Sequence, residues 1–301
     1  MTDLMVQPSP RTAEFLRAPT PTAYKGASGA AIRSHYDVPS EFYALWLDRN
    51  MMYSCAMWEK PGTLEDAQVR KIDYHIEQSQ AAGKARVLDI GCGWGGTLRR
   101  LSDVAGIGSA VGLTLSPAQA AWIAKDPRSN VDVRVEGWAD HEPTGPYGAI
   151  ISIGALEHFA RPELSDDDMV QAYREFFLKC SRWLEPGGRL SLQTMAYGTA
   201  TRDKINPFIL EHIFPESDLP TLSAIVRAFN GVFEIERLRN DRMDYAETYR
   251  QYGRRLRARR GEAVDLVGDD VVRRFETYCG LFILGFHTGA MDLLRLTLRK
   301  L

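Results

Sequence analysis

Residues 86–96 constrain the fold more than any other segment of this sequence. A short apolar stretch, Arg-Val-Leu-Asp-Ile, is followed directly by Gly-Cys-Gly-Trp-Gly-Gly, and a helical pattern begins at Leu98. Glycines between a strand and a helix let the backbone approach a ligand closely and leave the amides of the helix N-terminus available to it. The segment therefore predicts a strand, a ligand-binding loop and a helix within an α/β fold.

The rest of the chain continues this alternation of strands and helices. Apolar strands are expected at residues 109–115, 131–135, 148–153, 189–194, 232–238 and 293–298. Helices are expected at residues 98–104, 117–124, 167–184, about 243–260 and 269–284. Strands that alternate with helices at this spacing predict a parallel sheet that is covered on both faces.

The composition excludes several classes of protein. Of 301 residues, 45% are hydrophobic and the formal net charge is -2, so we expect a globular fold without the basic field that attracts nucleic acid. The four cysteines are scattered, which predicts no disulfide scaffold, no metal site and a reducing, cytoplasmic location. Because no stretch has the length and apolarity of a bilayer span or the pattern of a signal peptide, at most peripheral membrane contact is expected.

The glycine loop allows two interpretations. Gly91, Gly93 and Gly96 fit the GxGxxG pattern of dinucleotide-binding proteins. However, Asp89 precedes the glycines, where a carboxylate suits a cationic ligand better than a pyrophosphate. The acid that would hold a ribose after the second strand is also missing, because residues 112–116 read Gly-Leu-Thr-Leu-Ser. S-adenosylmethionine (SAM), which carries an ammonium group and an adenosine but no diphosphate, fits the loop better than NAD.

Several separate motifs resemble those of one enzyme family. They are His35-Tyr36-Asp37, Tyr53-Ser54-Cys55-Ala56, residues 63–68, residues 87–96, residues 112–116, residues 154–159, Ile213-Phe214-Pro215 and Asp244-Tyr245-Ala246. In this order they resemble the cyclopropane fatty acid synthase and mycolic acid cyclopropane synthase family. The resemblance implies a class I SAM-dependent methyltransferase, with a Rossmann-like, mostly parallel sheet of seven strands and an added N-terminal helical cover.

The same resemblance suggests how the chain is divided. We expect a flexible arm at residues 1–30, a helical cover over the cofactor at 31–83, and the SAM-binding domain at 84–301. Within that domain we expect a substrate lid at about 196–230 and a helical insertion at about 243–285.

The resemblance also implies a set of cofactor-binding residues. Tyr53, Ser54, Asp89 and the backbone of Gly91 and Gly93 would contact the methionine end of SAM. The remaining positions, which include those expected at the ribose and adenine, are Thr114, Leu115, Gln119, Trp138 and Ile153. In the family an acidic residue often follows this tryptophan, but Ala139 stands here, so that contact is not expected.

A second set of residues carries the chemistry by resemblance. The family holds a bicarbonate ion as anion and base, and Cys55, Glu157 and Tyr245 match three of its ligands. The family's histidine at the end of the fifth strand is replaced here by Gln193. Glutamine can donate a hydrogen bond, but it carries no charge and relays no proton at neutral pH.

This departure leaves several reactions open. The favoured one is SAM-dependent C-methylation or cyclopropanation of an alkene in a hydrophobic, lipid-like substrate, through a carbocation that Glu157 or bound bicarbonate deprotonates. The alternatives are N-methylation of a small amine and C-methylation of a prenyl diphosphate. The sequence leaves the oligomeric state open, with a homo-oligomer among the alternatives.

Overall fold

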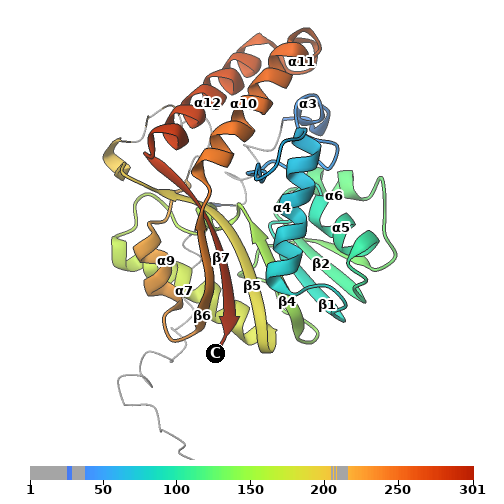
Figure 1. Cartoon of the computed structure of the whole chain (residues 1–301), viewed down its shortest axis with the longest axis vertical. Coiled ribbons are helices and arrows are strands. Elements are labelled where there is room, and N and C mark those ends of the chain that lie inside the picture. The colour runs from blue at the N-terminus through green and yellow to red at the C-terminus, as the bar shows by residue number, and fades with distance from the viewer. Residues whose placement is uncertain (1–25, 29–37, 205, 207, 209–215) are drawn as a thin grey trace, which may run out of the picture.

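The computed structural model describes residues 26–28, 38–204, 206, 208 and 216–301. Its centre is a seven-stranded sheet in the order β3-β2-β1-β4-β5-β7-β6 (Figure 1). The strands are β1 (Arg86–Ile90), β2 (Ser109–Thr114), β3 (Val131–Val135), β4 (Tyr147–Ile153), β5 (Leu184–Tyr197), β6 (Phe233–Asn240) and β7 (Met291–Lys300). Strands β1 to β5 pair in parallel, whereas β7 is antiparallel to both β5 and β6. The predicted fold, a mostly parallel sheet of seven strands, is confirmed.

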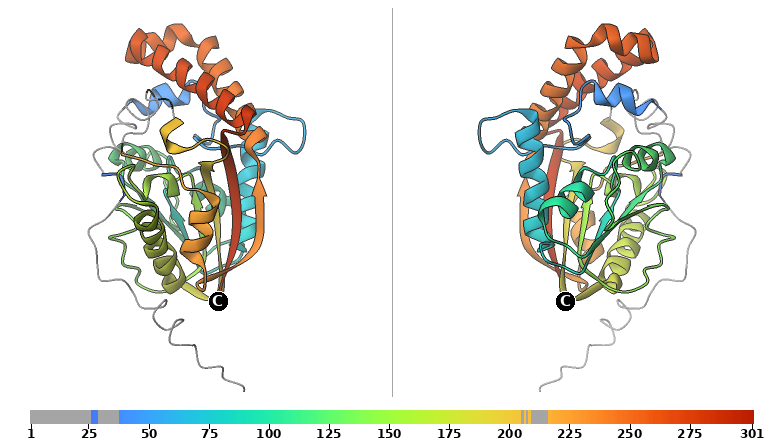
Figure 2. Two further views of the ribbon diagram at one scale, coloured as in Figure 1. Left: turned by 90° about the vertical axis from the view of Figure 1, so that its left-hand side faces the viewer. Right: turned by 90° about the vertical axis from the view of Figure 1, so that its right-hand side faces the viewer.

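Helices cover both faces of this sheet and its carboxyl edge. One face carries α4 (Leu64–Ser79), α5 (Gly96–Val104) and α6 (Pro117–Ile123), and the other carries α7 (Asp166–Trp183) and α9 (Leu222–Phe229) (Figures 1 and 2). Above the carboxyl edge lie α3 (Ser40–Ala44), α10 (Arg242–Ala258), α11 (Arg260–Val267) and α12 (Asp269–Thr288). The described residues also form two short 3-10 helices, η1 (Leu156–His158) and η2 (Arg202–Lys204). Among the described residues, no helix is both long and apolar enough to cross a bilayer.

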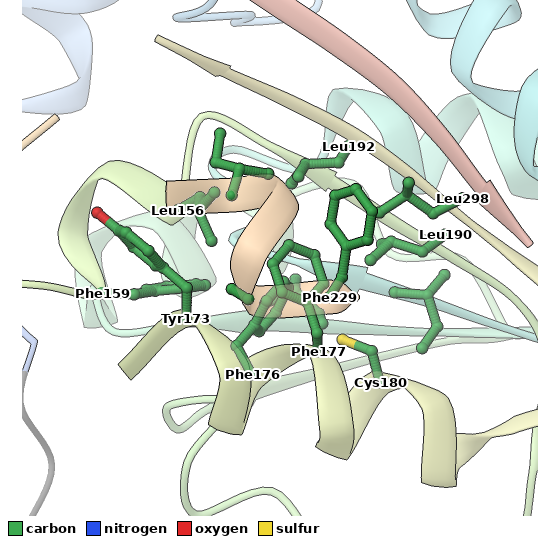
Figure 3. Packing of buried hydrophobic residues seen from close by; sticks show 14 of the residues in the cluster. Leu156, Phe159, Tyr173, Phe176, Phe177, Cys180, Leu190, Leu192, Phe229 and Leu298 are labelled. Atoms are coloured by element: carbon green, nitrogen blue, oxygen red, sulfur yellow. The ribbon is translucent and has the colours of Figure 1, made fainter. Parts of the chain in front are cut away.

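The face under α7 is the apolar core. Buried residues recur along α7 at helical spacing, including Phe176 and Phe177, and they contact Leu190 of β5 and Phe229 of α9 (Figure 3). Removing such an aromatic side chain typically costs about 3–5 kcal/mol. This layer fixes β5 firmly and leaves its opposite face available for polar groups.

The face under α4 is different, because α4 buries polar side chains there. Thr63 and Asp66 form a capping box that starts the helix. Lys71 and His75 point inward and are fully buried. His75 contacts Ser191 on β5 at 2.8 Å, so a polar layer lies between α4 and the strand.

The helices above the carboxyl edge enclose a second cluster that is rich in aromatic rings. Tyr249 of α10 contacts Tyr278 and Phe282 of α12, with ring centroids 5.3 and 5.0 Å apart. The hydroxyl of Tyr252 donates to the carbonyl of Met52 at 2.7 Å, which ties α10 to the segment before α4. The helical insertion thus packs onto the cofactor side of the domain.

The structure differs from the sequence-based elements in three places. The helical stretch expected at about 243–260 is α10, which ends at Ala258, but neither α11 nor α9 was predicted. Strand β5 begins at Leu184 rather than at residue 189, because Leu184 already pairs with Tyr147 of β4 and Gly187 accommodates the irregularity with a φ of +68°. Most of the expected arm, the motifs at 35–37 and 213–215, and part of the expected lid lie outside the described residues.

Candidate active site

The glycine loop lies where the topology of the sheet reverses. Strands β1 and β4 are neighbours, but the chain leaves them toward opposite edges of the sheet, and ligands of such folds bind at this point beyond the carboxyl ends of the strands. The loop after β1 contributes Gly91 and Gly93, and the loop after β4 contributes Gly154. All three glycines have positive φ angles.

Two cavities meet at these glycines. Gly91, Gly93, Gln119 and Gly154 line both of them, so they form one continuous site. The first cavity is otherwise lined mainly by apolar side chains and includes Thr114, Leu115 and Trp138. The second includes Tyr53, Ser54, Asp89 and Ile153. Each of the ten residues that the sequence predicts as cofactor-binding therefore lines one or both cavities.

The two loop glycines serve different purposes. A Cβ atom on Gly91 would lie 2.7 Å from the Cβ of Ala155, so this glycine lets two loops pass closely. A Cβ on Gly93 would meet nothing within 4 Å, because Gly93 faces the open cavity. The space beside Gly93 is the space that a bound ligand would fill.

Asp89 gives the second cavity its charge. It is 2% exposed, and its Oδ2 atom makes no hydrogen bond within the described residues. Burial raises the pKa of Asp89 to about 7, and the nearby Lys71 opposes part of that increase. A buried carboxylate without a hydrogen-bonding partner is costly, so it fits a ligand that brings a positive charge.

Lys71 lies behind the same cavity and was not predicted from the sequence. Its ammonium group donates to the hydroxyl of Ser54 at 2.9 Å. Burial lowers the pKa of Lys71 to about 7. It therefore supports the wall of the cavity through Ser54.

Glu157 is a second buried carboxylate near the site. It lies on η1, directly after the cavity-lining loop, and its Oε1 accepts the backbone N–H of Met195 at 2.7 Å. Its Oε2 is buried and makes no hydrogen bond within the described residues. Burial raises the pKa of Glu157 to about 7, so this group can gain and lose a proton near neutral pH.

The other three predicted catalytic residues are Cys55, Gln193 and Tyr245. Cys55 and Tyr245 are buried in the same cluster as Met195, which is the β5 residue whose N–H donates to Glu157. The Cys55 thiol donates to the carbonyl of Ala56 at 3.1 Å, and burial raises its pKa to about 12. Cys55 is therefore a neutral hydrogen-bond donor.

Gln193 lies beside this cluster on β5. It is paired across the sheet with Ile153 on β4 and with Arg295 on β7. Its side-chain oxygen accepts a hydrogen bond from Nε of Arg295 at 2.9 Å. The structure thus brings Gln193 together with Cys55, because Nη2 of Arg295 lies 3.5 Å from the Cys55 sulfur.

Comparison with known proteins gives this arrangement a family. The family described as Mycolic acid cyclopropane synthetase matches residues 25–296. The chain belongs to this family. Its members are SAM-dependent methyltransferases, and so is this protein.

Individual relatives agree over most of the chain. Cyclopropane mycolic acid synthase 2 of Mycobacterium leprae is 34% identical over 287 residues, which cover 88% of this chain and 89% of that protein. Hydroxymycolate synthase MmaA4 of Mycobacterium tuberculosis is 31% identical over 82% of this chain and 84% of its own length. The crystal structure of mycolic acid cyclopropane synthase CmaA1 complexed with SAH and CTAB has a TM-score of 0.81 at 29% identity, and covers 91% of this chain and 99% of that one.

The residues present fit the cofactor of a methyltransferase. SAM carries an ammonium group, which can provide the hydrogen-bonding partner that Asp89 lacks. The open space beside Gly93 and the apolar lining of the first cavity suit the ribose and the adenine.

Glu136 is a further cavity-lining residue that the sequence analysis missed. It follows β3 directly, lines the first cavity, and accepts a hydrogen bond from the buried His141 at 2.7 Å. The sequence did contain a signal for Glu136, because a carboxylate directly after a parallel strand lies at the edge of the sheet where ligands bind. Glu136 lies two residues before Trp138, whereas the position after Trp138, where the family often has an acid, is Ala139.

Proposed function

We propose that this methyltransferase family member transfers the methyl group of SAM to a carbon–carbon double bond in a hydrophobic acceptor. Glu157 carries the proposal, because it is a buried base beside the cofactor cavities with one free oxygen and a pKa of about 7. An alkene has no acidic proton to give up before it reacts. It therefore needs a base only after the methyl group has been transferred.

The reaction balances in two steps. The π electrons of the alkene form a bond to the methyl carbon, the bond from that carbon to sulfur breaks, and S-adenosylhomocysteine is released. The neighbouring carbon is left with a positive charge. Oε2 of Glu157 then accepts a proton, either from the new methyl group, which closes a cyclopropane, or from an adjacent carbon, which leaves a methylated alkene.

The aromatic surroundings suit a cationic intermediate. The ring of Tyr245 lies 4.8 Å from that of Tyr249 and 4.7 Å from that of Phe286. Aromatic faces stabilise a desolvated cation by about 2 kcal/mol. Relatives named for mycolic acid synthesis act on lipids by name, which supports a lipid-like acceptor for this chain.

The family's bicarbonate ion would be held by Cys55, Gln193, Tyr245 and Glu157. The Gln193 NH₂ group would donate to it, and the Cys55 thiol would turn its proton from the Ala56 carbonyl toward the ion. Bicarbonate would supply a negative charge next to the developing cation.

All four cysteines of the chain are unpaired and buried, which supports a reducing, cytoplasmic location for this chemistry.

The test uses SAM with a fully deuterated methyl group and a panel of unsaturated phospholipids, prenyl diphosphates and amines. We expect a product on an alkene, and its mass separates the outcomes. Loss of one deuterium indicates ring closure, and retention of three indicates methylation. Product formed only on amines would refute the proposal.

The same assay tests the role of Glu157. We expect Glu157→Gln to lower kcat at least about 100-fold, since general-base catalysis contributes this much. The affinity for S-adenosylhomocysteine should stay within about threefold, because Gln can still accept the Met195 N–H through its amide oxygen. Undiminished turnover in this variant would remove Glu157 from the mechanism.

A further inference from the structure

The last strand of the sheet holds a charged residue where its neighbours are apolar. Arg295 lies on β7 between Leu294 and Leu296, and its side chain is fully buried. Burying a guanidinium is costly unless each donor has a partner. Nothing in the family resemblance assigns a role to this residue.

The guanidinium of Arg295 is held from three sides. Nη1 forms an ion pair with Asp241, which precedes α10. Nη2 donates to the carbonyl of Ala56 at 3.0 Å and lies 3.5 Å from the sulfur of Cys55. Because Asp241 balances the charge, Arg295 affects the site mainly through the positions of the groups that it contacts.

The remaining donor, Nε, determines the orientation of Gln193. An arginine side chain has five N–H donors and no acceptor, so the Gln193 atom 2.9 Å from Nε must be the amide oxygen. His75 lies on the same oxygen, with Nε2 at 3.5 Å. The NH₂ group of Gln193 must therefore point away from Arg295.

We propose that Arg295 is a positioning residue, which fixes the Gln193 amide so that its NH₂ group serves as a donor to the anion held by Cys55, Glu157 and Tyr245. The inference rests on the anion site of the proposed function. A free glutamine side chain can present either its oxygen or its nitrogen, and the oxygen would repel an anion. With Arg295 in place, only the donor is presented.

The experiment measures binding of bicarbonate to the complex with S-adenosylhomocysteine, by NMR of protein labelled with ¹⁵N at glutamine side chains. Gln193→Glu identifies the NH₂ signal of Gln193 by its disappearance. We expect bicarbonate to shift this signal in the wild-type protein, and chloride at equal ionic strength to leave it unchanged.

The variants separate positioning from a general structural role. Arg295→Gln should weaken bicarbonate binding at least tenfold, because a glutamine can both donate to and accept from Gln193 and so releases the amide. Arg295→Lys keeps a donor and the charge, and should restore part of the affinity. Arg299→Gln, on the same strand but half-exposed and paired with Glu234, is the matched control and should bind bicarbonate as the wild type does.

The outcomes distinguish this inference from the proposed function. Equal bicarbonate affinity in the wild type and in Arg295→Gln would overturn the inference, as would a Gln193 signal that bicarbonate does not shift. Neither result bears on methyl transfer to alkenes, which the experiment with deuterated SAM tests separately. If Arg295→Gln loses S-adenosylhomocysteine binding and does not fold, Arg295→Lys and Gln193→Glu decide the question, since Gln193→Glu keeps the contact with Arg295 and removes the donor.

Discussion

At the scale of single residues, Asp89 makes cofactor binding depend on pH. Burial raises the pKa of Asp89 to about 7, and an ammonium group binds only its ionised form. As pH rises from 6 to 8, the ionised fraction therefore increases, and we expect the affinity for S-adenosylhomocysteine to increase about tenfold before it levels off. Calorimetric titration across this range measures the effect.

The substitution Asp89→Asn tests the same charge directly. We expect it to weaken S-adenosylhomocysteine binding about 10- to 100-fold, as is typical for losing a charged hydrogen bond, and to remove the pH dependence. Asp270→Asn is the control, because Asp270 is 95% exposed on α12. A variant at Asp89 that binds tightly with an unchanged pH profile would show that another group recognises the ammonium.

At the scale of elements, we expect alanine at two glycines of the loop between β1 and α5 to affect stability and ligand binding differently. Alanine at Gly91 or Gly93 is strained by about 1–2 kcal/mol, because both φ angles are positive. Gly91→Ala also forces a clash with Ala155, so it should lower the free energy of unfolding further. Gly93→Ala should cost only the strain, but it should weaken S-adenosylhomocysteine binding at least tenfold, since its methyl group enters the cavity.

A third glycine provides the control for backbone strain. Gly231 has a φ of +72° and no atom within 4 Å of an added Cβ, and it lies in the turn between α9 and β6, far along the chain from the cofactor loops. Gly231→Ala should therefore destabilise the protein as Gly93→Ala does and leave ligand binding intact. Chemical denaturation and calorimetry on the three variants make the comparison, and equal ligand affinity in all of them would contradict it.

The same two scales show what the sequence could and could not predict. The strands and the glycine loop were predictable because apolar periodicity and glycine spacing are local signals. The ten positions predicted for the cofactor, all of which line the two cavities, followed from the family resemblance. Arg295 was not predictable as a site residue, since its contact with Gln193 depends on the pairing of β5 with β7, about a hundred residues apart in the chain. Helix α11 was missed for a different reason, because it has only eight residues and buries only Ala263, so it shows little apolar periodicity.

At the scale of the whole molecule, one wall of the cofactor site is hydrogen-bonded to helices that do not themselves line the cavities. The segment 51–54 forms one wall of the second cavity. Gln68 of α4 donates to the carbonyl of Ser54 at 2.9 Å, and Tyr252 of α10 donates to that of Met52 at 2.7 Å. A ligand that orders this wall should therefore also stabilise both helices, although neither contributes a residue to either cavity.

Hydrogen exchange measures this coupling. We expect saturating S-adenosylhomocysteine to slow amide exchange in α4 and α10 as well as in the cofactor loops, because a ligand that binds the folded state suppresses every opening that disrupts its site. Tyr252→Phe removes the hydrogen bonds that join α10 directly to residues 51–54, so in this variant the ligand should protect α10 less than in the wild type and protect α4 as before. Some protection of α10 should remain, because Thr248 and Arg255 still bond to Ala56 and Leu47. If the wild-type protection is confined to the loops that touch the ligand, the wall moves independently of the helices, and the cover over the cofactor is not one cooperative unit with the sheet.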